Sequence, residues 1–265
     1  MTLSGSFLAV SGSVTGRDHR RAERDGQDGH AVVITDDVVA AIVTDGCSSG
    51  RASEIGARVG AAWLAALIEQ AFRGVDEATA ARAAAAVVSR TLLDRLEILA
   101  RSFDPVGHVS AARVDAALLF GFLAAVVTPA TTIVFGIGDG IVVVDGAITV
   151  IDPGPENAPP YLAYALLGGA GGERGGGRDA RAGLAPRIHF AGATAHVEAV
   201  GVATDGAAPL VDAGSPALAT IVADSRYARN PSLLRKRLIV LSDAGTFADD
   251  TTIAIVRRTE CRRPA

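Results

Sequence analysis

Cysteine is scarce in this sequence, and the two cysteines present lie far apart. Cys47 and Cys261 form no CxxC pair. Cysteine spacing of this kind indicates a reducing compartment and excludes the usual cysteine-based zinc sites.

An excess of positive charge and a long apolar run are also missing. Lys and Arg number 25 against 29 Asp and Glu, which gives a formal net charge of -4. Proteins that bind nucleic acid without sequence preference are usually basic, so this composition argues against that class.

The longest apolar stretch, 114–127, is interrupted by Asp115 and Gly121 and is too short to span a bilayer. The N-terminus has no basic leader before its apolar residues. We therefore expect a soluble, cytoplasmic protein with no nucleic-acid or membrane partner.

Aromatic residues make up only 5% of the chain, but hydrophobic residues make up 49%. This is enough apolar material for a folded core, which argues against disorder. The length of 265 residues allows one large domain or two small ones.

The apolar pattern predicts alternating groups of strands and helices. Short runs at 31–34 and 38–43 predict a hairpin, and helical spacing predicts helices over 52–73 and 76–103. Further strands are expected at 116–127, 131–137, 141–144, 147–151, 188–190, 196–203 and 252–256. Two more helical segments are expected near 215–223 and 231–242. Short links between strands favour antiparallel pairing.

This order is not a βαβ alternation, and it favours one domain over residues 1–265 with packed sheets and helices outside. Residues 168–183 are rich in Gly and Arg, which predicts a mobile surface loop. The alternative is a flap near a site, with its arginines meeting an anionic substrate.

Acidic residues recur where the predicted strands end or begin. Three apolar strands end in Asp-Gly, at Asp45, Asp139 and Asp205, and two strands begin after Asp28 and after the pair Asp249 and Asp250. The end of one antiparallel strand lies beside the start of its neighbour. The hairpin over 31–43 should therefore bring Asp28 and Asp45 together, and pairing of the Asp205 and Asp249 strands would add those carboxylates. A hairpin tip at Asp139 would point to the same edge.

Several carboxylates at one edge repel each other unless a cation neutralises them. Oxygen ligands without Cys or His favour Mg²⁺ or Mn²⁺ over Zn²⁺. The simpler interpretation is that each Asp-Gly is a turn, as expected for Asp145-Gly146 between two strands. A hairpin turn does not explain Asp45 and Asp205, because a helical pattern follows each of them.

Five blocks of the sequence occur in this order: 16-GRDHRRAERDGQDGHAVV-33, 43-VTDGCSSGRASEIGAR-58, 136-GIGDGIVVVDG-146, 202-VATDG-206 and 249-DDTTIAIVRR-258. Together they resemble the bacterial branch of the PP2C-type (PPM) serine/threonine phosphatases. The resemblance implies an α+β fold, a four-layer α-β-β-α sandwich of two antiparallel sheets flanked by helix pairs. It also implies hydrolysis of phosphoserine or phosphothreonine in a protein by a water that two Mn²⁺ or Mg²⁺ ions activate. Some members use a third ion.

The resemblance also implies a role for each acid. Asp45 resembles the carboxylate that bridges two metals, and Gly46 resembles the backbone carbonyl ligand. Asp205 and Asp249 resemble the remaining ligands of the first metal, with Asp250 at the position after the ligand. Asp28 resembles the residue that holds metal-bound water, and Asp139 resembles a residue of an additional, weaker metal site.

The chain departs from the family pattern at two positions. Gln27 stands where many members have a Glu that helps to hold the second metal, and Glu23 stands at the position of the phosphate-binding Arg. Arg20, Arg21 and Arg24 are approximate replacements for that Arg, and we expect Arg20 or Arg24 to bind phosphate.

His19 aligns with the His of this branch's motif. If it is catalytic, its task would be to protonate the leaving oxygen, since that needs an acid near neutral pH. The alternative is a structural histidine.

Two other functions fit the same residues. A PP2C-like binding or sensor module with a weakened metal site would bind Mn²⁺ or a phosphopeptide without turnover. A small-molecule phosphohydrolase would prefer a small phosphate ester over phosphopeptides.

Overall fold

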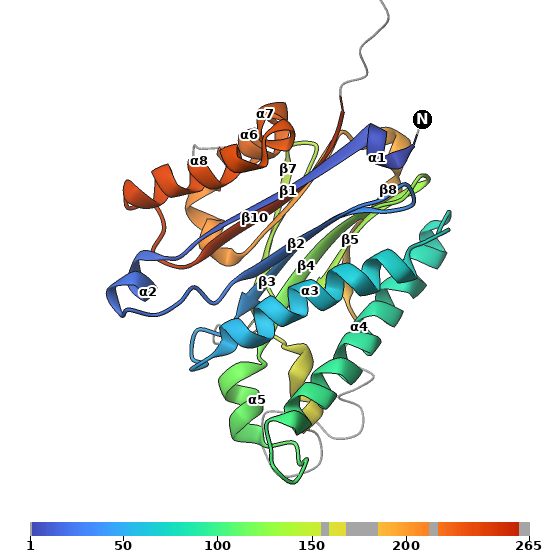
Figure 1. Ribbon diagram of the computed structural model, residues 1–265. Coiled ribbons are helices and arrows are strands. Elements are labelled where there is room, and N and C mark those ends of the chain that lie inside the picture. Colours follow the sequence, from blue (N-terminus) through green and yellow to red (C-terminus); the bar gives the residue numbers. More distant parts are fainter. Residues whose placement is uncertain (1, 155–158, 168–184, 212–216, 260–265) are drawn as a thin grey trace, which may run out of the picture.

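The computed structural model describes residues 2–154, 159–167, 185–211 and 217–259, which form two five-stranded antiparallel sheets packed face to face (Figure 1). The first sheet has the order β1 (Phe7–Val14), β10 (Thr251–Arg258), β9 (Ala199–Ala203), β6 (Gly140–Val144) and β7 (Ala147–Ile151). The second has the order β2 (Gly29–Ile34), β3 (Val39–Gly46), β4 (Phe120–Val127), β5 (Thr131–Ile137) and β8 (Arg187–Ala193).

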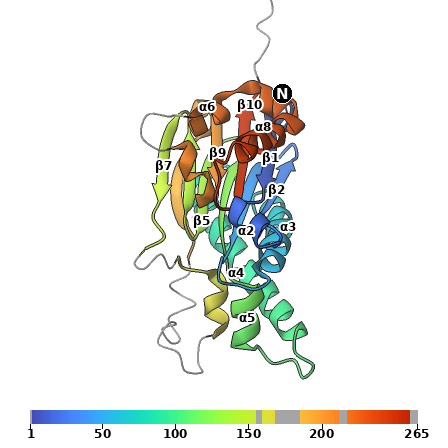
Figure 2. The same cartoon turned by 90° about the vertical axis from the view of Figure 1, so that its left-hand side faces the viewer.

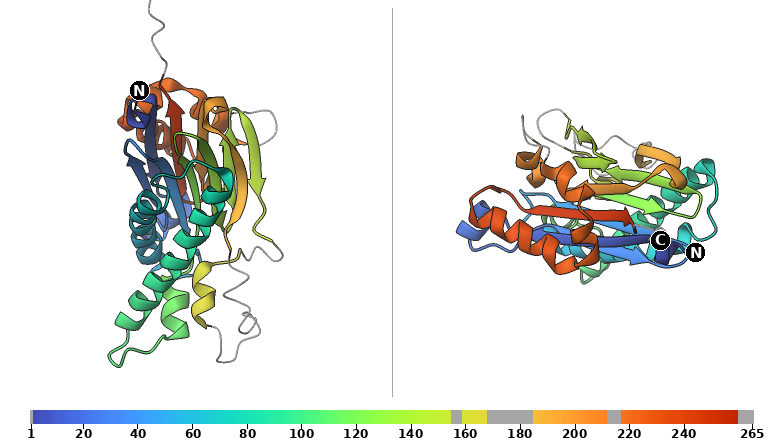
Figure 3. Two further views of the ribbon diagram at one scale, coloured as in Figure 1. Left: turned by 90° about the vertical axis from the view of Figure 1, so that its right-hand side faces the viewer. Right: turned by 90° about the horizontal axis from the view of Figure 1, so that it is seen from above.

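Helices cover the outer face of each sheet. The long helices α3 (Ser53–Ala71) and α4 (Ala78–Ser102) pack on the second sheet, and α4 and α5 (Ala111–Ala117) continue past its end (Figure 2). The first sheet is covered by α6 (Ala217–Ala223), α7 (Ser225–Arg229) and α8 (Pro231–Asp243), with α8 running along β1 (Figure 3). Shorter elements are α1 (Leu3–Ser6), α2 (Arg17–Arg21) and the 3₁₀ turns η2 (Leu162–Leu167), η4 (Thr194–His196) and η5 (Asp205–Leu210). The predicted four-layer α+β sandwich is confirmed.

The burial of β3 explains its continuous apolar sequence. Val39, Ala41 and Val43 pack between the sheets, while Ala40 and Ile42 pack against the helices. A strand that is covered on both faces has no need of polar residues between its apolar ones. The run VVAAIV is therefore typical of a central strand.

The predicted helices begin and end within a few residues of their predicted positions, but two strand predictions are wrong in part and one strand was missed. Residues 116–117 belong to α5, so β4 begins only at Phe120. Residues 194–196 form η4, so β9 begins at Ala199. The first strand, β1, was not predicted because Ser11-Gly12-Ser13 has the composition of a loop. It pairs with β10 at the other end of the chain, from Phe7↔Arg258 to Val14↔Thr251.

The predicted hairpin around Asp139 is also wrong. The strands on either side, β5 and β6, belong to different sheets, so Asp139 lies on a crossover between the layers. The next turn is the predicted hairpin, with Asp145 at φ 48° and Gly146 at φ 87°. Positive φ at both positions matches the type I′ turn that joins two neighbouring strands tightly.

Within the described residues, no helix is long and apolar enough to cross a membrane. The loop predicted at 168–183 lies outside the described residues.

Candidate metal centre

Five of the acidic residues come together at one end of the sandwich, where the two sheets meet. Gly29 pairs with Thr44 across β2 and β3, which sets Asp28 beside Asp45. Ala203 pairs with Ile253 across β9 and β10, so Asp205 and Asp249 leave their strands at the same end. The crossover at Asp139 arrives there as well, since the charge of Asp139 acts on Asp45.

Four of the carboxyls at this end, those of Asp28, Asp45, Asp139 and Asp249, have raised pKa values. Burial raises the pKa of Asp45 well above its usual value, and the neighbouring charges of Asp28, Asp205 and Asp139 add to the rise. Burial likewise raises the pKa of Asp28. Burial, followed by the charge of Asp205, raises the pKa of Asp139 to about 6. Partial burial, followed by the charge of Asp205, raises the pKa of Asp249. Negative charge is unfavourable at this end of the molecule unless a cation joins it.

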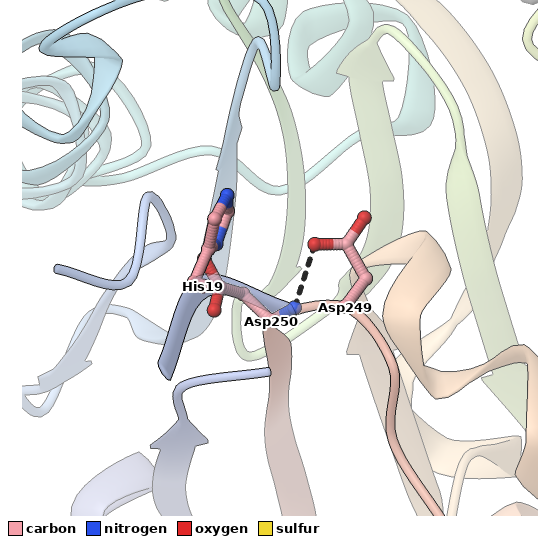
Figure 4. A group of neighbouring side chains, drawn as sticks. All are labelled: His19, Asp249 and Asp250. Atoms are coloured by element: carbon pink, nitrogen blue, oxygen red, sulfur yellow. Dashed lines mark hydrogen bonds and ion pairs between the residues drawn. The ribbon is translucent and has the colours of Figure 1, made fainter. Parts of the chain in front are cut away.

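The adjacent residues Asp249 and Asp250 have different surroundings (Figure 4). Asp250 is 3% exposed and accepts hydrogen bonds from Gly16 N (2.6 Å), Gln27 N (2.6 Å) and His19 Nδ1 (2.8 Å). Asp249 is an exposed residue, and among the described residues its carboxylate accepts a hydrogen bond only from Asp250 N, at 2.8 Å. Ligand atoms of His19, Asp249 and Asp250 lie within 4.8 Å of one another. The open carboxylate in this group is therefore that of Asp249.

The position of His19 depends on Asp250. His19 lies on α2 and is half-buried, with Nδ1 2.8 Å from Asp250 Oδ2. A carboxylate can only accept hydrogen bonds, so Nδ1 carries the hydrogen and Nε2 is the nitrogen left for other partners.

The groups around the Gln27 side chain favour an amide, which can donate hydrogen bonds, over a carboxylate, which cannot. Its side chain is 2% exposed, and Nε2 donates to Gly50 O (2.9 Å) and Ser53 Oγ (2.6 Å). Oε1 is buried and has no hydrogen-bond partner among the described residues. A Glu here would place an acceptor against the Gly50 carbonyl, which explains the amide at this position.

The two arginines expected to bind phosphate are held in different ways. Arg24 donates from Nη2 to Gly50 O at 2.7 Å, so it helps to anchor the loop after β3. Arg20 is exposed, and its nearest acidic partner is Asp243 at 3.9 Å. Arg20 therefore has the freer guanidinium.

Two glycines at this end are required by close contacts. A Cβ on Gly46 would lie 2.6 Å from Gln27 O, and a Cβ on Gly206 would lie 1.9 Å from Asp250 O. Each Asp-Gly pair thus lets another segment of the site cross directly over the backbone.

Sequence reasoning missed two polar residues that support the site. Thr204 donates to Asp28 Oδ2 at 3.0 Å and accepts from Thr252 N at 3.0 Å, which ties the end of β9 and the start of β10 to the start of β2. The repeated TDG in VTDG and ATDG was an available signal. Tyr161 also lies near the acidic cluster. Burial raises the pKa of its phenol, and so do the neighbouring groups of Cys47, Asp45 and Asp139. No local motif marks this tyrosine.

The comparisons with known proteins point to one family. The model of the family described as protein phosphatase 2C matches residues 15–162, which is more than half of the chain. No curated protein matches the chain.

Several solved structures share the fold. The *S. agalactiae* serine/threonine phosphatase is 15% identical, with a TM-score of 0.62, over 95% of this chain and 99% of that one. The serine/threonine phosphatase Stp1 from *Staphylococcus aureus* is 15% identical, with a TM-score of 0.56, over 98% of both chains. A bacterial serine phosphatase is 13% identical, with a TM-score of 0.62, over 97% of this chain and 99% of that one. At these identities the likeness is one of fold.

Proposed function

The chain belongs to the protein phosphatase 2C family, and on that premise we propose that it hydrolyses phosphoserine and phosphothreonine in proteins with two Mn²⁺ or Mg²⁺ ions held by the acidic end of the sandwich. The described elements would act as one phosphatase domain.

One observation carries the proposal: several carboxyls from both sheets meet at one end, and their pKa values are raised by burial and by one another. Such a cluster is stable in its charged form only with a cation. Its donors are carboxylate and carbonyl oxygens, together with the unpartnered Oε1 of Gln27, and these suit hard divalent ions.

We assign the ligand roles as follows. Asp45 is the proposed bridge because the charges of three other acids of the cluster act on it, and the Gly46 carbonyl follows it in β3. Asp205 and Asp249 complete the first site. Asp249 is preferred over Asp250 because it accepts one hydrogen bond, on Oδ1, whereas Asp250 accepts three over both of its oxygens. Asp28 is the proposed acceptor for metal-bound water, and Asp139 is the candidate for a third ion.

Bound divalent ions would lower the pKa of a water and offset charge on the phosphoryl oxygens. The protein's own groups do the rest. Asp250 holds His19 by Nδ1, which leaves Nε2 for other partners. When the ring carries a proton on each nitrogen, Nε2 would give its proton to the departing serine or threonine oxygen, and the ring would keep the proton on Nδ1. Arg20 would bind the phosphate, with Arg24 second because Gly50 already engages it.

The direct test is hydrolysis of a phosphothreonine peptide with and without Mn²⁺. Wild-type protein should be active only with the ion, and Asp45→Asn and Asp205→Asn should each lose activity. Asp145→Asn, at a turn, is the matched control. Full activity in the Asp45 and Asp205 variants would refute the assignment, and Mn²⁺ binding in calorimetry without turnover would indicate a binding module instead.

A further inference from the structure

The edge strands β1 and β2 run next to each other on one side of the sandwich (Figure 1). A polar groove lies along these two strands. Its volume is about 420 Å³. The groove is lined by Ser11, Gly12, Ser13, Asp28, Gly29, His30, Arg58 and Arg235. It therefore runs along the end of β1 and the start of β2 and reaches Asp28 of the proposed metal centre.

Two glycines allow a helix from each outer layer to reach this groove. A Cβ on Gly12 would lie 3.2 Å from Arg235 N, so α8 rests directly on β1. A Cβ on Gly29 would lie 2.8 Å from Ala57 O, so α3 rests directly on β2. Arg235 and Arg58 are the arginines at these two contacts, and both side chains line the groove although they come from opposite helical layers.

Neither arginine is neutralised by an acid within the described part of the chain. Arg58 is exposed and donates from Nη2 to the carbonyl of Gly26 at 2.9 Å, which leaves most of its guanidinium donors available. Arg235 is exposed, and its side chain has no ion pair or hydrogen bond to a described residue. The whole chain carries a net charge of -4, so the two free guanidiniums in one groove are not a result of a basic composition.

The other polar groups of the groove do not cancel this charge. His30 bonds through Nδ1 to Ser11 Oγ at 2.8 Å, and burial together with Arg235 lowers its pKa. Asp28 is the one acid in the lining, and it is 6% exposed, with Oδ2 accepting a hydrogen bond from Thr204. The groove thus presents two cations and several neutral donors beside the site of hydrolysis.

We propose that this groove binds acidic residues that flank the phosphorylated residue of a protein substrate, with Arg58 and Arg235 pairing with their carboxylates. The inference rests on the proposed function and names the class of substrate: phosphoproteins whose phosphorylated segment is acidic. Bidentate pairing with a carboxylate is the geometry that a guanidinium favours.

Two phosphothreonine peptides of equal length test the proposal, one with Asp and Glu flanks and one with Asn and Gln flanks. Wild-type protein should show a higher kcat/KM for the acidic peptide. Removing each arginine, as Arg58→Gln and Arg235→Gln, should reduce that preference by roughly two- to fivefold, as expected for exposed ion pairs. The double variant should treat the two peptides alike, and high salt should weaken the wild-type preference.

Hydrolysis of p-nitrophenyl phosphate, which has no flanks to bind, should be unchanged in the three variants. Arg90→Gln on α4 removes one exposed positive charge elsewhere and should keep the peptide preference. An unchanged preference in the double variant, or no preference in the wild type, would overturn the proposal. If wild-type protein hydrolyses neither peptide, the proposed function fails. The groove is then judged by fluorescence anisotropy, in which the acidic peptide should bind wild type more tightly than the double variant.

Discussion

The two ends of the sandwich both carry aspartates at strand ends, but the surroundings of these aspartates are opposite. At the far end, Asp145 Oδ1 accepts from Glu198 N (2.9 Å) and Ala199 N (2.8 Å), and Asp37 pairs with Arg73 at 3.6 Å. At the candidate metal centre, Asp28, Asp45 and Asp139 lie near other acids, and their pKa values are raised. The two turn aspartates have partners within the chain that offset their charge, whereas the mutual repulsion of the site's carboxylates requires a cation.

The largest effect should come from removing the central carboxylate. Asp45→Asn should lower Mn²⁺-dependent phosphatase activity by at least the order of a hundredfold, because even residues behind a metal ligand are worth 10- to 100-fold. The same change removes repulsion with Asp28 and Asp205, so the melting temperature without metal should rise. Activity assays and thermal unfolding in a chelator check the two halves. A drop in both would mean that Asp45 is mainly structural.

The second effect separates two adjacent acids. Asp250→Ala leaves Gly16 N, Gln27 N and His19 Nδ1 without an acceptor, so the free energy of unfolding should fall by about 2–4 kcal/mol. Asp249→Ala removes only the bond from Asp250 N, so it should lose activity with little change in stability. Urea unfolding of both variants, with activity measured alongside, tests the contrast. Equal losses of stability would contradict it.

The third effect is a reversed dependence of stability on pH. A carboxyl with a raised folded-state pKa favours the folded state while it is protonated, and this contribution is lost as pH rises through that pKa. For Asp139 the window runs from about pH 4, its unfolded value, to about 6. Metal-free protein should therefore lose stability over this range, and saturating Mn²⁺ should remove the loss.

Asp139→Asn isolates the contribution of this one carboxyl. The decline in metal-free stability between about pH 4 and about 6 should be shallower in the variant than in the wild type. Thermal unfolding across that range provides the measurement, and identical slopes would argue against the raised pKa.

The smallest effect is expected at the far end. Asp145→Asn weakens two hydrogen bonds to backbone N–H groups but keeps a residue that tolerates positive φ. Stability should fall by about 1 kcal/mol, and phosphatase activity should not change. A loss of activity here would remove the distinction between the two ends.

Local sequence patterns were sufficient for most elements and for the grouping of Asp28 with Asp45. The spacing of apolar residues located α3, α4 and the strands of the second sheet, because the buried faces of an element determine which of its consecutive residues are apolar. It failed at β1, whose partner β10 is more than two hundred residues away in the chain. It also failed at Asp139, since a short link between strands does not reveal that the chain changes sheets.

By itself, the sequence determined that strands end in aspartate and that helices follow two of them, because hydrophobic period and turn chemistry are local properties. The tertiary structure alone decided which aspartate carboxylates remain available to a ligand. The Asp250 carboxylate accepts hydrogen bonds from Gly16, Gln27 and His19, whereas that of Asp249 accepts one from Asp250 N. It also brought Arg58 and Arg235 from separate layers into one groove. Contacts between distant segments set both outcomes, and no local pattern encodes such contacts.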